Sequence, residues 1–230
     1  MKTSLPVLIL VLCLLTSLTP AAAAPALSGE INFAALDSVI NAQISKHGLP
    51  GVALAVIENG EIAYLQGYGV DGAGRPMTAQ TQMLIGSQSK SFTALAIAQL
   101  AEQGQLNLND PVQVYIPEFR VADEVASAQI TLNHLLHHTS GLSDAGFGIV
   151  IPLDATPQQA VQSLAQARLT APIGSSHQYF NLGYSVLAYI VELVSGQTYA
   201  DYIQEHILIP LGMNASTADP FHAADLAQGY

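Results

Sequence analysis

A single hairpin signal between segments of helical periodicity is the feature that most restricts the fold of this chain. Apolar runs at 52–57 and 62–65 flank Asn59 and Gly60, a dipeptide typical of a tight turn between antiparallel strands. Before the hairpin, residues 31–47 carry apolar side chains at the spacing of an amphipathic helix. The sequence therefore predicts an antiparallel β-hairpin packed with helices, which is an α+β arrangement.

The remainder of the chain is predicted to be mostly helical. Residues 68–76 are rich in glycine and are expected to form a loop. Residues 87–103 have a helical apolar stripe that ends at Gly104. Further helices are predicted over 130–137, 157–168, 183–195 and 198–208. A sheet-containing layer and a helical layer follow from this order.

The first 24 residues are typical of a secretory signal peptide. Lys2 precedes an apolar run over 5–18, and small residues follow at 21–24. The run is short for a membrane span, although an uncleaved anchor is the alternative. Cys13 is the only cysteine and lies in this segment, so residues 25–230 can form neither disulfides nor cysteine–zinc sites. We expect a secreted or periplasmic protein with no stable membrane span after cleavage.

The charge balance of the chain bears on its partners. Its 230 residues are half apolar, which suits one or two globular domains. Seventeen acidic residues stand against six lysines and arginines, for a net charge of −11. Nucleic-acid binding needs clustered cations, so we expect a small-molecule or peptide substrate and no nucleic-acid partner.

A serine and a lysine three residues apart form the most informative motif. Ser87 and Lys90 stand at the start of the predicted helix 87–103, where this separation places both side chains on one helix face. A neighbouring amine can help to activate a weak serine nucleophile. Ser89, next to Lys90, points to another helix face. The pair alone is equally compatible with a capping serine followed by a surface lysine.

Three further segments occur in a recognisable order. Tyr179 and Asn181 form a Tyr-x-Asn motif before a predicted helix, residues 135–142 read Leu-Leu-His-His-Thr-Ser-Gly-Leu, and residues 210–213 read Pro-Leu-Gly-Met. Together with Ser87 and Lys90, they resemble the N-terminal part of the class C β-lactamase and penicillin-binding-protein family of serine hydrolases. The resemblance covers about residues 31–230.

The resemblance implies a fold and a reaction. The fold would be β-lactamase/transpeptidase-like: an antiparallel sheet flanked by helices, plus a mostly helical domain. Residues 25–230 would form this domain, with 30–105 holding the N-terminal helix, hairpin and nucleophile helix, and 106–218 the helical region. Ser87 would attack an amide, ester or β-lactam carbonyl.

The other site residues receive their roles from the same resemblance. Tyr179 would exchange the serine proton, alone or in a relay with Lys90, and the sequence leaves open which of the two is the general base. Asn181 would hold Lys90 and a substrate amide. The backbone N–H of Ser87 would form half of an oxyanion hole. No cofactor is implied.

The match lacks one part of the family pattern. The family carries a third motif, Lys-Thr-Gly or His-x-Gly, on a strand after the helical domain, and no such motif follows Tyr179. We therefore expect the C-terminal strands and helix to be missing, in a fragment of a longer product or in a truncated relative. On this basis we expect little or no activity from the 230-residue chain alone.

Other functions are less compatible with the sequence. The histidines lack the spacing of common zinc motifs, so no metal site is predicted, and His138 is expected to be structural. No Gly-x-Ser-x-Gly motif of α/β-hydrolases is present. A non-catalytic penicillin-binding-like protein, binding or regulatory, stays open as the alternative to an enzyme.

Overall fold

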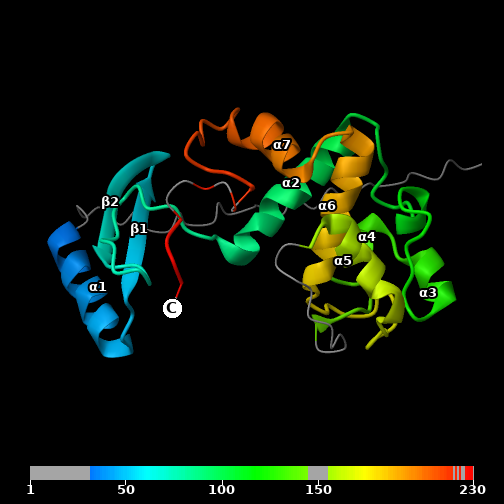
Figure 1. The fold of residues 1–230 in the computed structure, drawn as a ribbon, viewed down its shortest axis with the longest axis horizontal. Coiled ribbons are helices and arrows are strands. Elements are labelled where there is room, and N and C mark those ends of the chain that lie inside the picture. Colours follow the sequence, from blue (N-terminus) through cyan, green and yellow to red (C-terminus); the bar gives the residue numbers. More distant parts are fainter. Residues whose placement is uncertain (1–31, 145–154, 220, 222, 224–225, 230) are drawn as a thin grey trace, which may run out of the picture.

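The computed structural model describes residues 32–144, 155–219, 221, 223 and 226–229. The predicted signal peptide, residues 1–24, lies outside the described residues. Figure 1 shows helix α1 and the two strands at one end of the molecule, and most of the other helices at the opposite end, with α2 between them. None of the helices within the described ranges is long and apolar enough to cross a membrane.

The N-terminal helix and hairpin form as predicted. Helix α1, Phe33–His47, is capped by Asn32, and strands β1, Gly51–Glu58, and β2, Glu61–Gly69, pair in antiparallel fashion. The turn residues Asn59 and Gly60 both have positive φ, of 52° and 84°. Asparagine and glycine tolerate this conformation better than other residues, which explains why the hairpin turns there.

Strand β2 extends further than the sequence indicated. It includes Tyr68, which was expected to begin a loop and is instead buried. The hydroxyls of Tyr64 and Tyr68 donate to the same carboxylate oxygen of Asp37 on α1, at 2.5 and 2.6 Å. The ring of Phe33 stacks on Tyr64 with 4.6 Å between centroids. These contacts join α1 to the hairpin. The strand is longer because its backbone pairing with β1 continues to Gly69, and Tyr68 pairs with Val52.

The other helices follow the predicted order with different limits. Helix α2 spans Ser89–Glu102 after a one-turn 3-10 helix, η1, at Gly86–Gln88. Beyond it lie η2 (Val112–Val114), α3 (Glu124–Gln129), α4 (Leu132–Leu136), α5 (Pro157–Ser163), η4 (Leu164–Gln166), α6 (Asn181–Ser195), α7 (Tyr199–Ile203) and the π-helical turn η5 (Gln204–Leu208).

Several of these elements differ from the sequence expectation. Helix α3 was not predicted, and it depends on Asp123, whose carboxylate accepts from the backbone N–H groups of Val125 and Ala126. Helix α4 starts after residue 131 because Thr131 is its extended N-cap. The helix expected over 198–208 changes from α to π geometry at Gln204.

The apolar core lies in the helical part and is centred on α6. Helix α6 packs against α2, α4, α5 and α7. Ile97 and Leu100 of α2, and Leu187 and Ile190 of α6, are at most 1% exposed. Burial of such side chains stabilises a fold by roughly 1.5–3 kcal/mol each, so the α2–α6 contact is one of the strongest restraints on their mutual placement.

A carboxylate near the hairpin fastens the segment 226–229. Asp71 is 4% exposed and accepts bonds from the Arg75 guanidinium and from the backbone N–H of Gln228. Arg75 also donates to the carbonyl of Leu226 at 2.7 Å. Although burial opposes ionisation, these hydrogen bonds together lower the pKa of Asp71 to about 2.

Candidate active site

The predicted nucleophile lies in the turn that precedes α2. Gly86 adopts a left-handed φ of 54° and leads the chain into η1, which contains Ser87. Ser87 is exposed, and its backbone N–H belongs to the first turn of a helical run, where N–H groups lack intrahelical acceptors. The Ser89 hydroxyl donates to the Gly86 carbonyl at 2.7 Å, so Ser89 supports the turn.

Lys90 lies in the first turn of α2 and joins two parts of the site. Its Nζ donates to Ser87 Oγ at 3.0 Å and to Asn181 Oδ1 at 2.7 Å. The same atom is 4.9 Å from the centroid of the Tyr179 ring. The three-residue spacing from Ser87 therefore does bring the amine to the hydroxyl, although α2 itself starts two residues later than predicted.

Tyr179 approaches the nucleophile from the segment that leads into α6. Its hydroxyl is 2.7 Å from Ser87 Oγ. Hydrogen bonding with Lys90, followed by that with Ser87, lowers the pKa of the Tyr179 phenol, while slight burial and the negative charge of Asp144 oppose this change. A lowered pKa increases the share of the phenolate, which is the form able to accept a proton from Ser87. The side chain is 41% exposed, and solvent weakens this effect.

Asn181, the first residue of α6, completes the cluster. The structure thus places all four sequence-predicted site residues together: Ser87 and Lys90 by local geometry, and Tyr179 and Asn181 by the packing of α6 on α2. Asn181 has a further partner that the sequence reasoning missed. Asp144 accepts from its backbone N–H at 2.9 Å and from its side-chain Nδ2 at 2.5 Å.

His138 supports the same segment from the other side. Its carbonyl accepts from the Gln178 N–H at 2.7 Å, and its Nδ1 accepts from the Phe180 N–H at 3.2 Å. The imidazole lies against Tyr179, with 4.5 Å between ring centroids. Its backbone φ of 55° is unusual for a residue other than glycine. These contacts agree with the structural role expected for His138, and no contact with Ser87 or Lys90 is among them.

The described residues were also compared with the ligand groups of metal sites. Over the ranges 32–144 and 155–219 and the short C-terminal pieces, no three histidines, cysteines or carboxylates gather as metal ligands would. Ser140, which belongs to the Thr-Ser-Gly stretch, is buried and its Oγ accepts from the Leu142 N–H. It is a turn residue.

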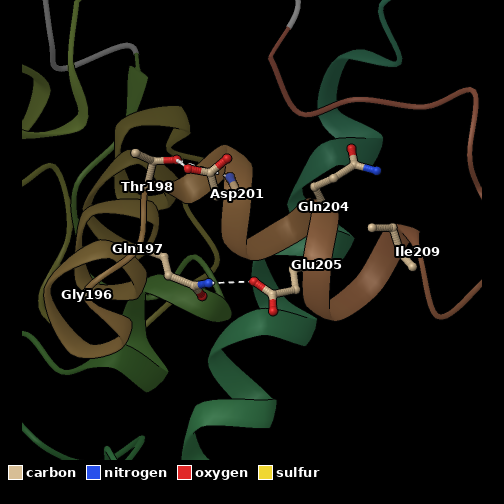
Figure 2. A pocket seen from close by; sticks show the side chains of 7 residues that line it. All are labelled: Gly196, Gln197, Thr198, Asp201, Gln204, Glu205 and Ile209. Atoms are coloured by element: carbon tan, nitrogen blue, oxygen red, sulfur yellow. Dashed lines mark hydrogen bonds between the residues drawn. The ribbon is translucent and has the colours of Figure 1, made fainter.

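An open hollow lies away from these residues, on α7 and η5. Figure 2 shows its lining side chains, which bond to one another: Gln197 donates to Glu205, and Thr198 donates to Asp201, each at 2.7 Å. None of the four predicted site residues lines it. Two pairs of its polar side chains bond to each other, and the hollow is separate from Ser87.

The ordered motifs agree with a comparison against known families. Residues 36–229 match the Beta-lactamase family. The chain belongs to the beta-lactamase family. This is a family of serine hydrolases that act on small-molecule or peptide substrates, and membership confirms the family resemblance that the sequence motifs indicated.

Individual relatives of this beta-lactamase-family chain are longer than it is. Protein flp of Staphylococcus aureus (strain MW2) is 32% identical over an alignment of 195 positions, which covers 79% of this chain and 37% of that protein. The octameric penicillin-binding protein homologue from Pyrococcus abyssi has a TM-score of 0.71 and 33% identity, over 87% of this chain and 48% of that one.

A second solved structure extends the comparison to a hydrolase. EstCE1, a hydrolase with promiscuous acyltransferase activity, has a TM-score of 0.73 and 27% identity, over 84% of this chain and 54% of that one. These similarities confirm the β-lactamase/transpeptidase-like fold. The chain spans about half the length of the two structures, and less of Protein flp.

Proposed function

We propose that the protein is a secreted serine hydrolase that forms an acyl-enzyme on Ser87 and cleaves an amide, ester or β-lactam bond. The observation that carries this proposal is the position of Ser87 Oγ between Lys90 Nζ, at 3.0 Å, and the Tyr179 hydroxyl, at 2.7 Å. Both lie within the reach needed for proton transfer in catalysis. The signal-like residues 1–24 support secretion to the periplasm or the medium.

Acylation would proceed in two stages. Ser87 Oγ forms a bond to the substrate carbonyl carbon while its proton passes to the Tyr179 phenolate, directly or through the Lys90 amine. The carbonyl oxygen becomes an oxyanion beside the backbone N–H of Ser87. When the intermediate collapses, the bond to the leaving group breaks, and the leaving group takes the proton back from Tyr179.

Deacylation would use the same residues with water as the nucleophile. Water loses a proton to Tyr179 as it attacks the ester carbonyl, and Ser87 Oγ regains a proton when its bond to carbon breaks. Asn181 would keep Lys90 next to the reacting oxygen and offer its amide to the substrate. Because one fold supports β-lactamases, peptidases and esterases, the proposal covers all three types of bond.

Covalent labelling of Ser87 tests the proposal. We expect a fluorophosphonate or an acylating penicillin to form a stoichiometric adduct that peptide mass spectrometry maps to Ser87. Ser87→Ala abolishes the adduct, whereas the neighbouring Ser89→Ala serves as the matched control and retains it. Tyr179→Phe slows labelling by about 10²- to 10⁴-fold, the range typical of a lost general acid–base group.

The opposite results would change the assignment. If every acylating probe leaves the folded, full-length protein unmodified, the protein is better described as a non-catalytic, penicillin-binding-like protein.

A further inference from the structure

Asp144 contacts both ends of the Tyr-x-Asn motif. Its carboxylate accepts from the backbone N–H of Asn181 at 2.9 Å and from the side-chain Nδ2 of Asn181 at 2.5 Å. Its own backbone N–H donates to the carbonyl of Tyr179 at 3.3 Å. Asp144 is 37 residues away from Asn181 in the chain, so the contact depends on the tertiary fold.

The contact determines which way the Asn181 amide faces. An asparagine amide has an acceptor oxygen and a donor NH₂ of nearly the same shape. The Lys90 ammonium offers only donors, and an ionised Asp144 carboxylate only acceptors. The observed orientation satisfies both neighbours, because Oδ1 faces Lys90 and Nδ2 faces Asp144. The reversed amide would place donor against donor and acceptor against acceptor.

The position of Asp144 at the start of α6 makes this arrangement stable. Phe180, the N-cap residue of α6, provides no side-chain acceptor. The Asp144 carboxylate supplies one from outside the helix, and negative charge is favourable at a helix N-terminus. The bond to the Asn181 N–H therefore anchors the same carboxylate that orients the Asn181 side chain.

We propose that Asp144 is a positioning residue for the acylation of Ser87. It holds the Asn181 amide with Oδ1 toward Lys90, and thereby holds Lys90 Nζ against Ser87 Oγ. The inference rests on the proposed function in one respect only, that labelling of Ser87 reports the reactivity of the site. The orientation of the Asn181 amide is a separate property that can be measured without any reaction.

The first test compares two aspartates that cap helices. Asp144→Ala and Asp144→Asn should lower the maximal rate of fluorophosphonate labelling at Ser87 by about 10²-fold, the effect of a small displacement of reacting groups, without changing the probe's apparent affinity. Asp123→Ala is the matched control, because Asp123 caps α3 with its carboxylate and touches no site residue among its described contacts. It should leave the labelling rate unchanged.

The second measurement is the NMR chemical shift of the Asn181 side-chain amide in the ¹⁵N-labelled protein. The signal is assigned by its absence from the spectrum of Asn181→Ala. We expect a strongly shifted Nδ2 proton in the wild type, and the loss of that shift in both Asp144 variants. Asp144→Asn keeps the shape of the side chain, so it should disturb the fold less than Asp144→Ala. Circular dichroism checks that both variants are folded.

The outcomes separate the two hypotheses. Unchanged amide resonances in both Asp144 variants would overturn the positioning role, as would labelling rates equal to that of the wild type. If the wild type itself is not labelled, the proposed hydrolase function fails, and the amide resonances alone then decide whether Asp144 orients Asn181.

Discussion

Replacing His138 tests how the site segment is supported. His138 Nδ1 accepts from the Phe180 N–H at 3.2 Å, so this nitrogen must be unprotonated. The ring also lies 4.5 Å from the Tyr179 ring and 5.2 Å from the Tyr184 ring, measured between centroids. Burial chiefly lowers the pKa of His138, with further contributions from His177 and Lys90, while the charge of Asp144 opposes them.

The magnitude follows from the bond that is lost. His138→Asn retains a residue that tolerates positive φ but removes the ring acceptor, and loss of a hydrogen bond to a buried group costs about 1–3 kcal/mol. His138→Ala loses the same bond without a side chain suited to positive φ, so it should be the less stable variant. Urea unfolding at pH 7.5 measures both. His137→Asn, at an exposed neighbouring position, is the control and should change stability by less than about 0.5 kcal/mol.

The pH dependence of the free energy of unfolding is a second, independent test of the environment of His138. Burial lowers the pKa of both His134 and His138 in the folded protein. Below about pH 6.5 the unfolded chain therefore binds protons first, and stability falls as pH falls, by at most about 1.4 kcal/mol per pH unit for each histidine. The loss is complete once the pH drops below the folded-state pKa.

His138→Asn should therefore lose less stability than the wild type between pH 7.5 and pH 5.0. An identical loss in the wild type and the variant, or a His138→Asn protein as stable as the wild type at pH 7.5, would refute this account of His138.

Two further predictions concern stability. Thr93, 4% exposed, shares a 2.7 Å hydrogen bond with the Tyr199 hydroxyl. Thr93→Val should cost about 1–3 kcal/mol, and combining it with Tyr199→Phe should cost less than the two single changes added together. If urea unfolding shows that the stability losses of the two single variants simply add up in the double variant, the hydrogen bond between Thr93 and Tyr199 does not contribute to stability. Bonds from Tyr64 and Tyr68 lower the pKa of Asp37, so its stabilising effect is present above about pH 4 and is lost as the pH falls through the lowered value. In Asp37→Asn, the melting temperature should fall less than in the wild type as the pH is lowered from 6 to 2. An equal fall in both proteins would show that Asp37 does not contribute to this pH dependence.

The hairpin and the Ser87–Lys90 pair were predictable because their interactions are local. Asn59 and Gly60 adopt the positive φ values that their side chains allow. A separation of three residues near a helix start places Lys90 Nζ on the same face as Ser87 Oγ, and the two atoms are 3.0 Å apart in the structure.

Short elements were less predictable from the sequence. Helix α3 has six residues, too few for a hydrophobic period to be recognised, and it depends on the Asp123 cap. The change to π geometry after Ile203 has no sequence signal in this chain that we can identify. Tyr68 was assigned to a loop because of the glycines around it, whereas it pairs with Val52 of β1 and its hydroxyl also bonds to Asp37 on α1.

The sequence by itself determined the family, the order of the main elements and the residues proposed to carry the chemistry. Only the tertiary structure decided how those residues meet. Tyr179 and Asn181 are 92 and 91 residues from their partners Ser87 and Lys90, and Asp144, which no motif singled out, reaches Asn181 from a different loop. Such contacts form because burying the apolar faces of α2 and α6 against each other fixes the start of one helix beside the start of the other, and no local rule encodes that placement.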